Sequence, residues 1–129
     1  MSYSIDRVIE GRDFASVVDR ARETLAEQGF GVLTEIDVKA TLKKKLDVDV
    51  APYLILGACN PKLAHKVLEA EPRIGVLLPC NVVVRELGDG RIEVSAMDPE
   101  AAMEVVDNPK VAEVASQVRE LLSRAVQAI

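Results

Sequence analysis

The 129 residues of this chain suit one domain with its own hydrophobic core. A net charge of -5 and an aromatic content of only 3% argue against a nucleic-acid-binding protein, because phosphate backbones need basic surfaces and single strands need aromatic stacking platforms. The apolar runs are far too short to cross a membrane, and the first residues lack the charged start and apolar core of a signal peptide. We therefore expect a single cytoplasmic domain over residues 1–129.

The first 36 residues predict two strands separated by a helix. Apolar and polar residues alternate over residues 3–9, which is the pattern of a half-buried strand. Asp13 is expected to cap a helix that begins at Phe14, carries apolar residues three and four positions apart, and ends at Gly29. Alternation returns over residues 30–36, which predicts a second strand directly after the helix.

The next segment predicts a short helix, a third strand and another helix start. Asp37 is expected to cap the short helix, whose four lysines we interpret as a solvated face because two aspartates follow them. Pro52 precedes a strand over residues 53–58. Asn60 stands directly before a proline, and this pair is typical of a helix start, because the asparagine oxygen accepts from an unpaired N–H and proline has no N–H to lose. We expect Asn60 to cap a helix over residues 61–70.

The second half predicts a long apolar run, a hairpin and a terminal helix. Residues 74–84 are too apolar and too rich in branched side chains to be exposed, and Pro79 interrupts them with a kink, bulge or sheet edge. Residues 88–90 read Gly-Asp-Gly and predict an antiparallel hairpin into a strand over residues 91–97. Asn108 begins the longest helix, which has a broad apolar stripe that must cover a sheet or a partner.

These elements add up to one α+β domain. The sequence contains no internal repeat, low-complexity tract or linker. The predicted architecture is a single, mostly antiparallel sheet with helices packed on one face.

Four motifs occur in order along the chain. They are GFGVLTEIDVKATL at residues 29–42, ILGACNP at 55–61, GVLLPCNVVV at 75–84 and MDP at 97–99. Together they resemble the domain-of-unknown-function 302 family, over essentially the whole chain. The resemblance implies a compact α+β fold grouped with TATA-box-binding-protein-like architectures, a homodimer, and no established biochemical activity. It carries over no catalytic residue, and a fold grouping is not evidence for DNA binding.

The candidate functional site lies in two of these motifs. Each of the two cysteines, Cys59 and Cys80, is followed by an asparagine, Asn60 and Asn81, and each has a proline nearby. Cys59 is expected to end a strand at the N-terminus of a helix, where the helix dipole favours a thiolate and free amides could hold a small anion. Cys59 and Cys80 are therefore the candidates for a catalytic role.

Three other interpretations of the same residues stay open. If the strands that carry Cys59 and Cys80 lie side by side, the two thiols could form a reversible disulfide or supply two ligands of a soft metal. Asn60 and Asn81 could instead form a polar pocket for a small metabolite, with the cysteines lining it. Both cysteines could also be core packing alone, which is common for free thiols.

No familiar enzyme constellation or cofactor motif is present in the sequence. It contains no Ser-His-Asp or Cys-His arrangement that we can place, and no phosphate-binding glycine loop. The single histidine, His65, is expected on the solvent side of its helix beside Glu69, so we predict neither a metal site nor a cofactor.

Two functional hypotheses follow from the sequence. The favoured one is a homodimeric small-molecule-binding or regulatory domain with its site around the Cys-Asn pairs, because apolar strands and a long apolar helix occur without a catalytic set. The alternative is a thiol-dependent enzyme or redox sensor using Cys59 with Cys80, or a soft-metal-binding protein. Whether the chain is an enzyme stays open at this point.

Overall fold

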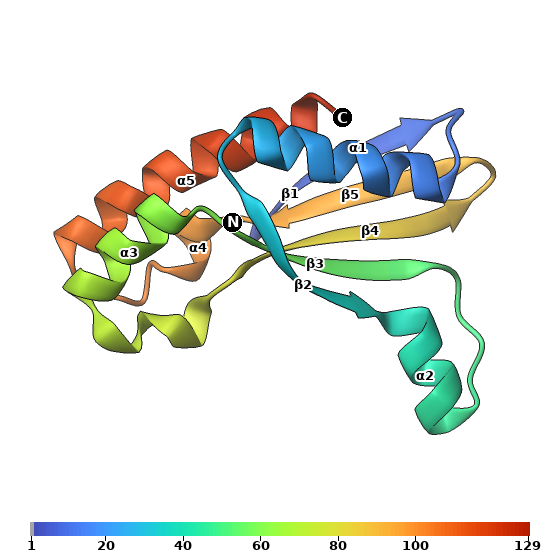
Figure 1. Cartoon of the computed structure of the whole chain (residues 1–129), viewed down its shortest axis with the longest axis horizontal. Helices are drawn as coiled ribbons and strands as arrows, with labels where there is room; N and C mark the ends of the chain where they lie inside the picture. Colours follow the sequence, from blue (N-terminus) through green and yellow to red (C-terminus); the bar gives the residue numbers. More distant parts are fainter. Residues whose placement is uncertain (1) are drawn as a thin grey trace.

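The computed structural model describes residues 2–129; strands and helices alternate as far as residue 70, and a hairpin of two strands and two helices follow (Figure 1). The strands are β1 (Ser4–Glu10), β2 (Gly31–Asp37), β3 (Tyr53–Cys59), β4 (Cys80–Gly88) and β5 (Arg91–Met97). The helices are α1 (Phe14–Glu27), α2 (Val38–Leu46), α3 (Pro61–Ala70), α4 (Pro99–Ala102) and α5 (Pro109–Gln127), with a 3-10 helix η1 (Pro72–Leu77) between α3 and β4.

All five strands form one sheet in the order β1-β5-β4-β3-β2, and every neighbouring pair is antiparallel. The prediction of a single antiparallel sheet in an α+β domain is therefore confirmed. The pairing aligns one row of residues across all five strands, and because side chains alternate along a strand, the members of a row share one face. This row consists of Asp6, Ser95, Val83, Ile55 and Ile36. We call the face that carries it the open face.

The opposite face of the sheet forms the core with the helices. Leu56, Val82 and Val94 project from the central strands and are buried almost completely. Helices α1 and α5 cover this face, and α5 buries one stripe of its surface, as the apolar spacing predicts. The buried residues of that stripe are Val111, Val114, Ala115, Val118, Leu122, Ala125 and Val126. Helices α1 and α5 lie side by side above the sheet in Figure 1 and cover most of this face.

The predicted helix starts are confirmed by the hydrogen bonds of their caps. Asp13, Asp37, Asn60 and Asn108 each accept from a backbone N–H two or three residues further on, at 2.7, 2.9, 3.4 and 3.0 Å. Each bond satisfies an N–H that the first helical turn leaves without a partner, so the start of the helix depends on residues close in sequence.

The prediction of one buried apolar run over residues 74–84 was wrong in its first half. Residues 72–77 form the 3-10 helix η1, in which Ile74 is buried but Val76 is fully exposed. Strand β4 begins only at Cys80, because Pro79 has no N–H to donate to a ladder. Branched residues alone did not decide the backbone conformation, since a proline at the first position of η1 also favours a helical turn.

Helix α2 is the exception to the packing of helices on one face. It buries none of its residues and projects from the β2–β3 edge, below the sheet in Figure 1, whereas α1 and α5 lie above it. Leu46 and Val48 are 66% and 44% exposed. Among the described residues, no helix is both long enough and apolar enough to cross a membrane.

Candidate functional site

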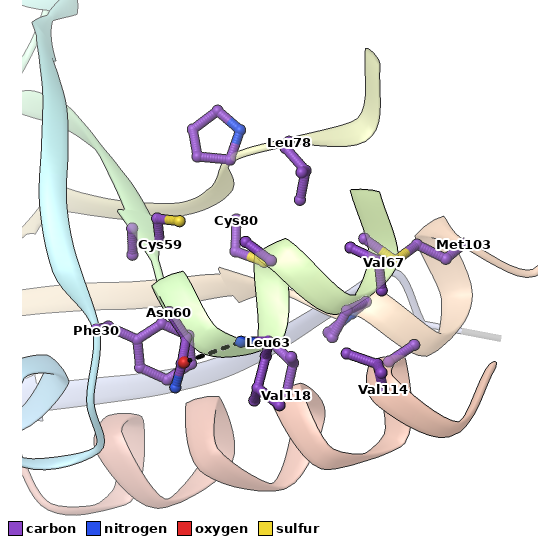
Figure 2. A pocket seen from close by; sticks show the side chains of 15 residues that line it. Phe30, Cys59, Asn60, Leu63, Val67, Leu78, Cys80, Met103, Val114 and Val118 are labelled. Carbon is purple, nitrogen blue, oxygen red and sulfur yellow. Dashed lines mark hydrogen bonds between the residues drawn. The ribbon is translucent and has the colours of Figure 1, made fainter. Parts of the chain in front are cut away.

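The two cysteines lie at the same end of the sheet and line one cavity (Figure 2). Cys59 is the last residue of β3 and Cys80 is the first of β4, and these strands pair so that Ala58 stands directly opposite Cys80. Neighbouring strands thus place the two thiols close together, although the residues are 21 positions apart in the sequence.

The cavity is small and largely apolar. Apart from the two thiols and Asn60, all of its lining side chains are apolar, and they come from the sheet end, α3, α4 and α5. Its volume is about 30 Å³, which is room for about two water molecules. The remaining lining residues are Phe30, Ala58, Leu63, Ala64, Val67, Leu78, Pro79, Pro99, Met103, Val114, Ala115 and Val118.

Burial holds both thiols in their protonated form. Desolvation by burial, together with a smaller effect of the neighbouring Cys59 in the same direction, raises the pKa of Cys80 to about 11. Burial also raises the pKa of Cys59, although this side chain is only partly buried. A thiolate is the reactive species of cysteine, so these surroundings oppose nucleophilic chemistry near neutral pH.

The N-terminus of α3 adds less to this site than its position suggests. Pro61 has no N–H, Leu63 donates its N–H to the side chain of Asn60, and Ala64 donates to the Asn60 carbonyl. Of the first four helical residues, only Lys62 keeps an N–H that could face an anion. The helix dipole remains, but a cradle of several amides, which anion sites at helix starts normally use, is not formed there.

The structure separates the two asparagines. Asn60 lines the thiol cavity and caps α3, whereas Asn81 is paired with Gly57 and points to the open face. Asn81 lines a separate shallow groove there, together with Tyr53 and Arg85. The reason is the alternation of side chains in β4: Cys80 points toward the core, so the next residue points away from it. One pocket shared by both asparagines is not formed.

Two glycines lie near the site; the sequence indicated Gly29 only as the end of the first helix and did not single out Gly57. At Gly57, a Cβ would lie 2.0 Å from Thr34 Oγ1 and 2.9 Å from Pro79 Cγ, so only glycine lets Pro79 lie where it does, at the wall of the cavity. At Gly29, φ is +86°, and a Cβ would come within 3.1 Å of Asn60 Nδ2. Gly29 therefore serves both the left-handed turn after α1 and the placement of the Asn60 amide.

The sequence also did not predict which residues form the far wall of the cavity. Met103, directly after α4, and Val114 and Val118 of α5 line it, and Figure 2 labels all three around the cavity with Asn60 and Cys80. Their apolar spacing predicted burial but gave no sign that they would face the cysteines, since that depends on how α5 crosses the sheet.

His65 lies away from the cavity on the exposed side of α3. Its Nε2 is 3.4 Å from Glu69 Oε1, and both side chains are exposed, as the sequence predicted. Within residues 2–129, no group of three or more His, Cys, Asp and Glu side chains is arranged to hold a metal ion.

Comparison with known proteins decides the family. A model of the family described as "Domain of unknown function DUF302" matches residues 6–129. The chain belongs to the DUF302 family. A crystal structure of an uncharacterized conserved DUF302 protein from Bacillus stearothermophilus is similar over 99% of this chain and 98% of that chain, with a TM-score of 0.90 and 26% sequence identity. No curated protein matches the chain. The resemblance seen in the motifs is thus confirmed, and the DUF302 description assigns no activity, so function has to be argued from the site.

Proposed function

We propose that this DUF302 domain is a non-enzymatic small-molecule-binding or regulatory domain, and that it works as a homodimer. The observation that carries the proposal is the cavity in which Cys59, Cys80 and Asn60 are the only polar lining groups. An apolar lining with a few polar groups has the chemical character of a ligand site. Its ligand is small, because the cavity holds about two water molecules in this conformation.

Binding is favoured over thiol catalysis because of the protonation of the cysteines. Catalytic cysteines normally have a lowered pKa, whereas burial raises the pKa of both Cys59 and Cys80. A neutral thiol is a weak hydrogen-bonding group that suits the recognition of a compact, weakly polar ligand. A reducing compartment such as the cytoplasm fits this proposal, since both cysteines are free thiols.

Native mass spectrometry of the purified protein, alone and with a library of small molecules, tests the proposal. We expect a bound small molecule in the wild type and its loss in Ala64→Leu, which fills the cavity without changing either thiol. The matched control is Ala112→Leu on the exposed side of α5, which should bind like the wild type. A wild type that binds no small molecule, or binding that Ala64→Leu leaves intact, contradicts the cavity as the ligand site.

Alkylation of Cys59 against pH separates the proposal from its enzymatic alternative. We expect a midpoint above about 8.5, the value of a free thiol, because burial raises the pKa of Cys59. Cys80→Ala leaves Cys59 as the only reactive group and makes the readout unambiguous. A midpoint well below that of a free thiol would favour a thiol-dependent enzyme or redox sensor instead.

The homodimer part of the proposal is supported by the open face, which presents apolar side chains such as Val8 and Ile36 to solvent. Light scattering after size exclusion measures it directly. We expect twice the chain mass of 14.0 kDa at micromolar concentration. A species of single chain mass under those conditions removes this part of the proposal and leaves the ligand site untouched.

A further inference from the structure

The open face is the largest surface of the sheet that nothing covers. The row from Asp6 to Ile36 crosses all five strands, and α2 lies on this side, at the β2 end (Figure 1). Val8 and Ile36 are 45% and 49% exposed. An antiparallel sheet can leave one face in water, and a contiguous apolar patch on such a face marks an interaction site.

Helix α2 extends this surface as an arm. Its apolar residues Val38 and Leu42 line a groove of about 210 Å³ together with Tyr53 and Arg85 of the open face. Leu46, one turn further along the same side, is 66% exposed and touches no core. The short helix therefore has an apolar side that its own domain covers only at the base.

Charge is distributed unevenly over the combined surface of open face and arm. Lys44 and Lys45 on α2 form no ion pair within residues 2–129, whereas the neighbouring Lys43 is paired with Asp47 and Asp49. At the opposite edge of the sheet, β1 presents Asp6 and Glu10, which also form no ion pair in the described chain. Asp6 and Glu10 lie on the open face. The side chain of Arg7 points to the opposite face, where it donates to backbone carbonyls at the C-terminal end of α5, and side chains alternate between faces along a strand.

A basic arm at one edge and an acidic strand at the other are self-complementary. A two-fold axis parallel to the strands turns one copy so that its β1 edge faces the β2–α2 edge of the other. Each arm then meets the acidic strand of its partner, and the two open faces meet between them, with Val83 and Ile55 at the centre of each face and the Arg85–Glu93 ion pair beside them. Such an isologous arrangement uses each patch twice, which is why a single chain can carry both halves.

The available area suits a stable dimer. Five strands of at least seven residues, about 4.8 Å apart and rising about 3.3 Å per residue, give the open face roughly 550 Å². Nine residues of α2 add about 130 Å², which brings the surface close to the ~800 Å² per partner of a standard interface.

We propose that the open face and α2 together form the interface between two copies of this chain, with α2 of each copy lying on the β1 edge of its partner. The inference rests on the homodimer of the proposed function and names its surface. The exposed apolar residues of α2 become buried in this assembly, and Lys44 and Lys45 approach Asp6 and Glu10 of the partner subunit.

Charge reversal with rescue tests the interface, using the full chain and dimer dissociation measured by analytical ultracentrifugation. Lys44→Glu with Lys45→Glu should weaken dimerisation at least tenfold, because both arms then face acidic strands. Asp6→Lys with Glu10→Lys should weaken it similarly. The variant that carries all four changes should recover most of the affinity, since the charges are exchanged rather than removed.

Control variants distinguish a wrong interface from the absence of any dimer and from a loss of folding. Lys62→Glu with Lys66→Glu reverses two exposed charges on α3, far from the open face, and should leave dissociation unchanged. Leu46→Ser removes the exposed apolar contact without changing charge and should also weaken the dimer. Circular dichroism should show an intact fold, because Leu46 packs against no core.

A wild type that is monomeric overturns both the homodimer and this interface. A wild-type dimer that neither charge pair nor Leu46→Ser weakens, or that the four changes do not rescue, overturns the interface alone.

Discussion

The two faces of the sheet are built from the same five strands but have different tasks. On the core face, Leu56, Val82 and Val94 are buried against α1 and α5 and hold the domain together. On the open face, Val83 and Ile55 share their strands with these residues but keep part of their surface in solvent. The core face also holds the thiol cavity. Stability and the candidate ligand site therefore depend on one side of the sheet, which leaves the other side free to bind a partner.

The largest expected difference in the free energy of unfolding is between a variant of a buried leucine and a variant of an exposed one. Leu56→Ala should lower the free energy of unfolding by about 3 kcal/mol, because it leaves a cavity between the sheet and the helices. Leu33→Ala is the matched control: Leu33 is 67% exposed at the irregularity in β2, and the change should stay within about 0.5 kcal/mol. Urea unfolding measures both. Equal losses in the free energy of unfolding would contradict the conclusion that the core face holds the domain together.

The second contrast concerns the two thiols and pH. The pKa of Cys80 is about 11 in the folded chain and about 8.5 when unfolded, so the unfolded chain releases this proton first as the pH rises. Stability is therefore fully present below about pH 8.5 and falls up to pH 11, by roughly 3 kcal/mol at most from this group.

Urea unfolding at several pH values measures this dependence. Cys80→Ala should flatten it, although the variant starts from a lower stability because it loses buried packing. Cys59→Ala is the control on the partly enclosed thiol and should leave most of the dependence in place. A slope that survives in Cys80→Ala would mean that other groups, such as lysines and tyrosines, cause it.

The smallest contrast is between the two asparagines. Asn60→Ala removes the cap of α3 and should cost about 1 kcal/mol. Asn81→Ala on the open face should change the free energy of unfolding by less than about 0.5 kcal/mol. Thermal unfolding of the two variants at a concentration where the chain is monomeric gives the difference. If Asn81→Ala proved the more damaging, the open face would have a structural role that its exposure does not indicate.

Features that depend on neighbouring residues could be predicted from the amino-acid sequence. The caps at Asp13, Asn60 and Asn108 and the hairpin between β4 and β5 could be predicted, because each is fixed by hydrogen bonds or turn geometry over two to four residues. The apolar spacing of α5 likewise predicted its buried stripe. Local periodicity was therefore enough for the α+β class and for most element boundaries.

Only the tertiary structure decided how these elements meet. The pairing register of β3 with β4 brings Cys59 and Cys80 to one cavity, and the alternation that follows from it sends Asn81 to the other face. The cavity is completed by Met103 and Val114, which come from much later in the chain. No spacing in the sequence encodes such contacts, because they depend on which strands pair and on where α5 crosses them. For the same reason the position of α2 on the open side, and with it the proposed interface, became visible only in three dimensions.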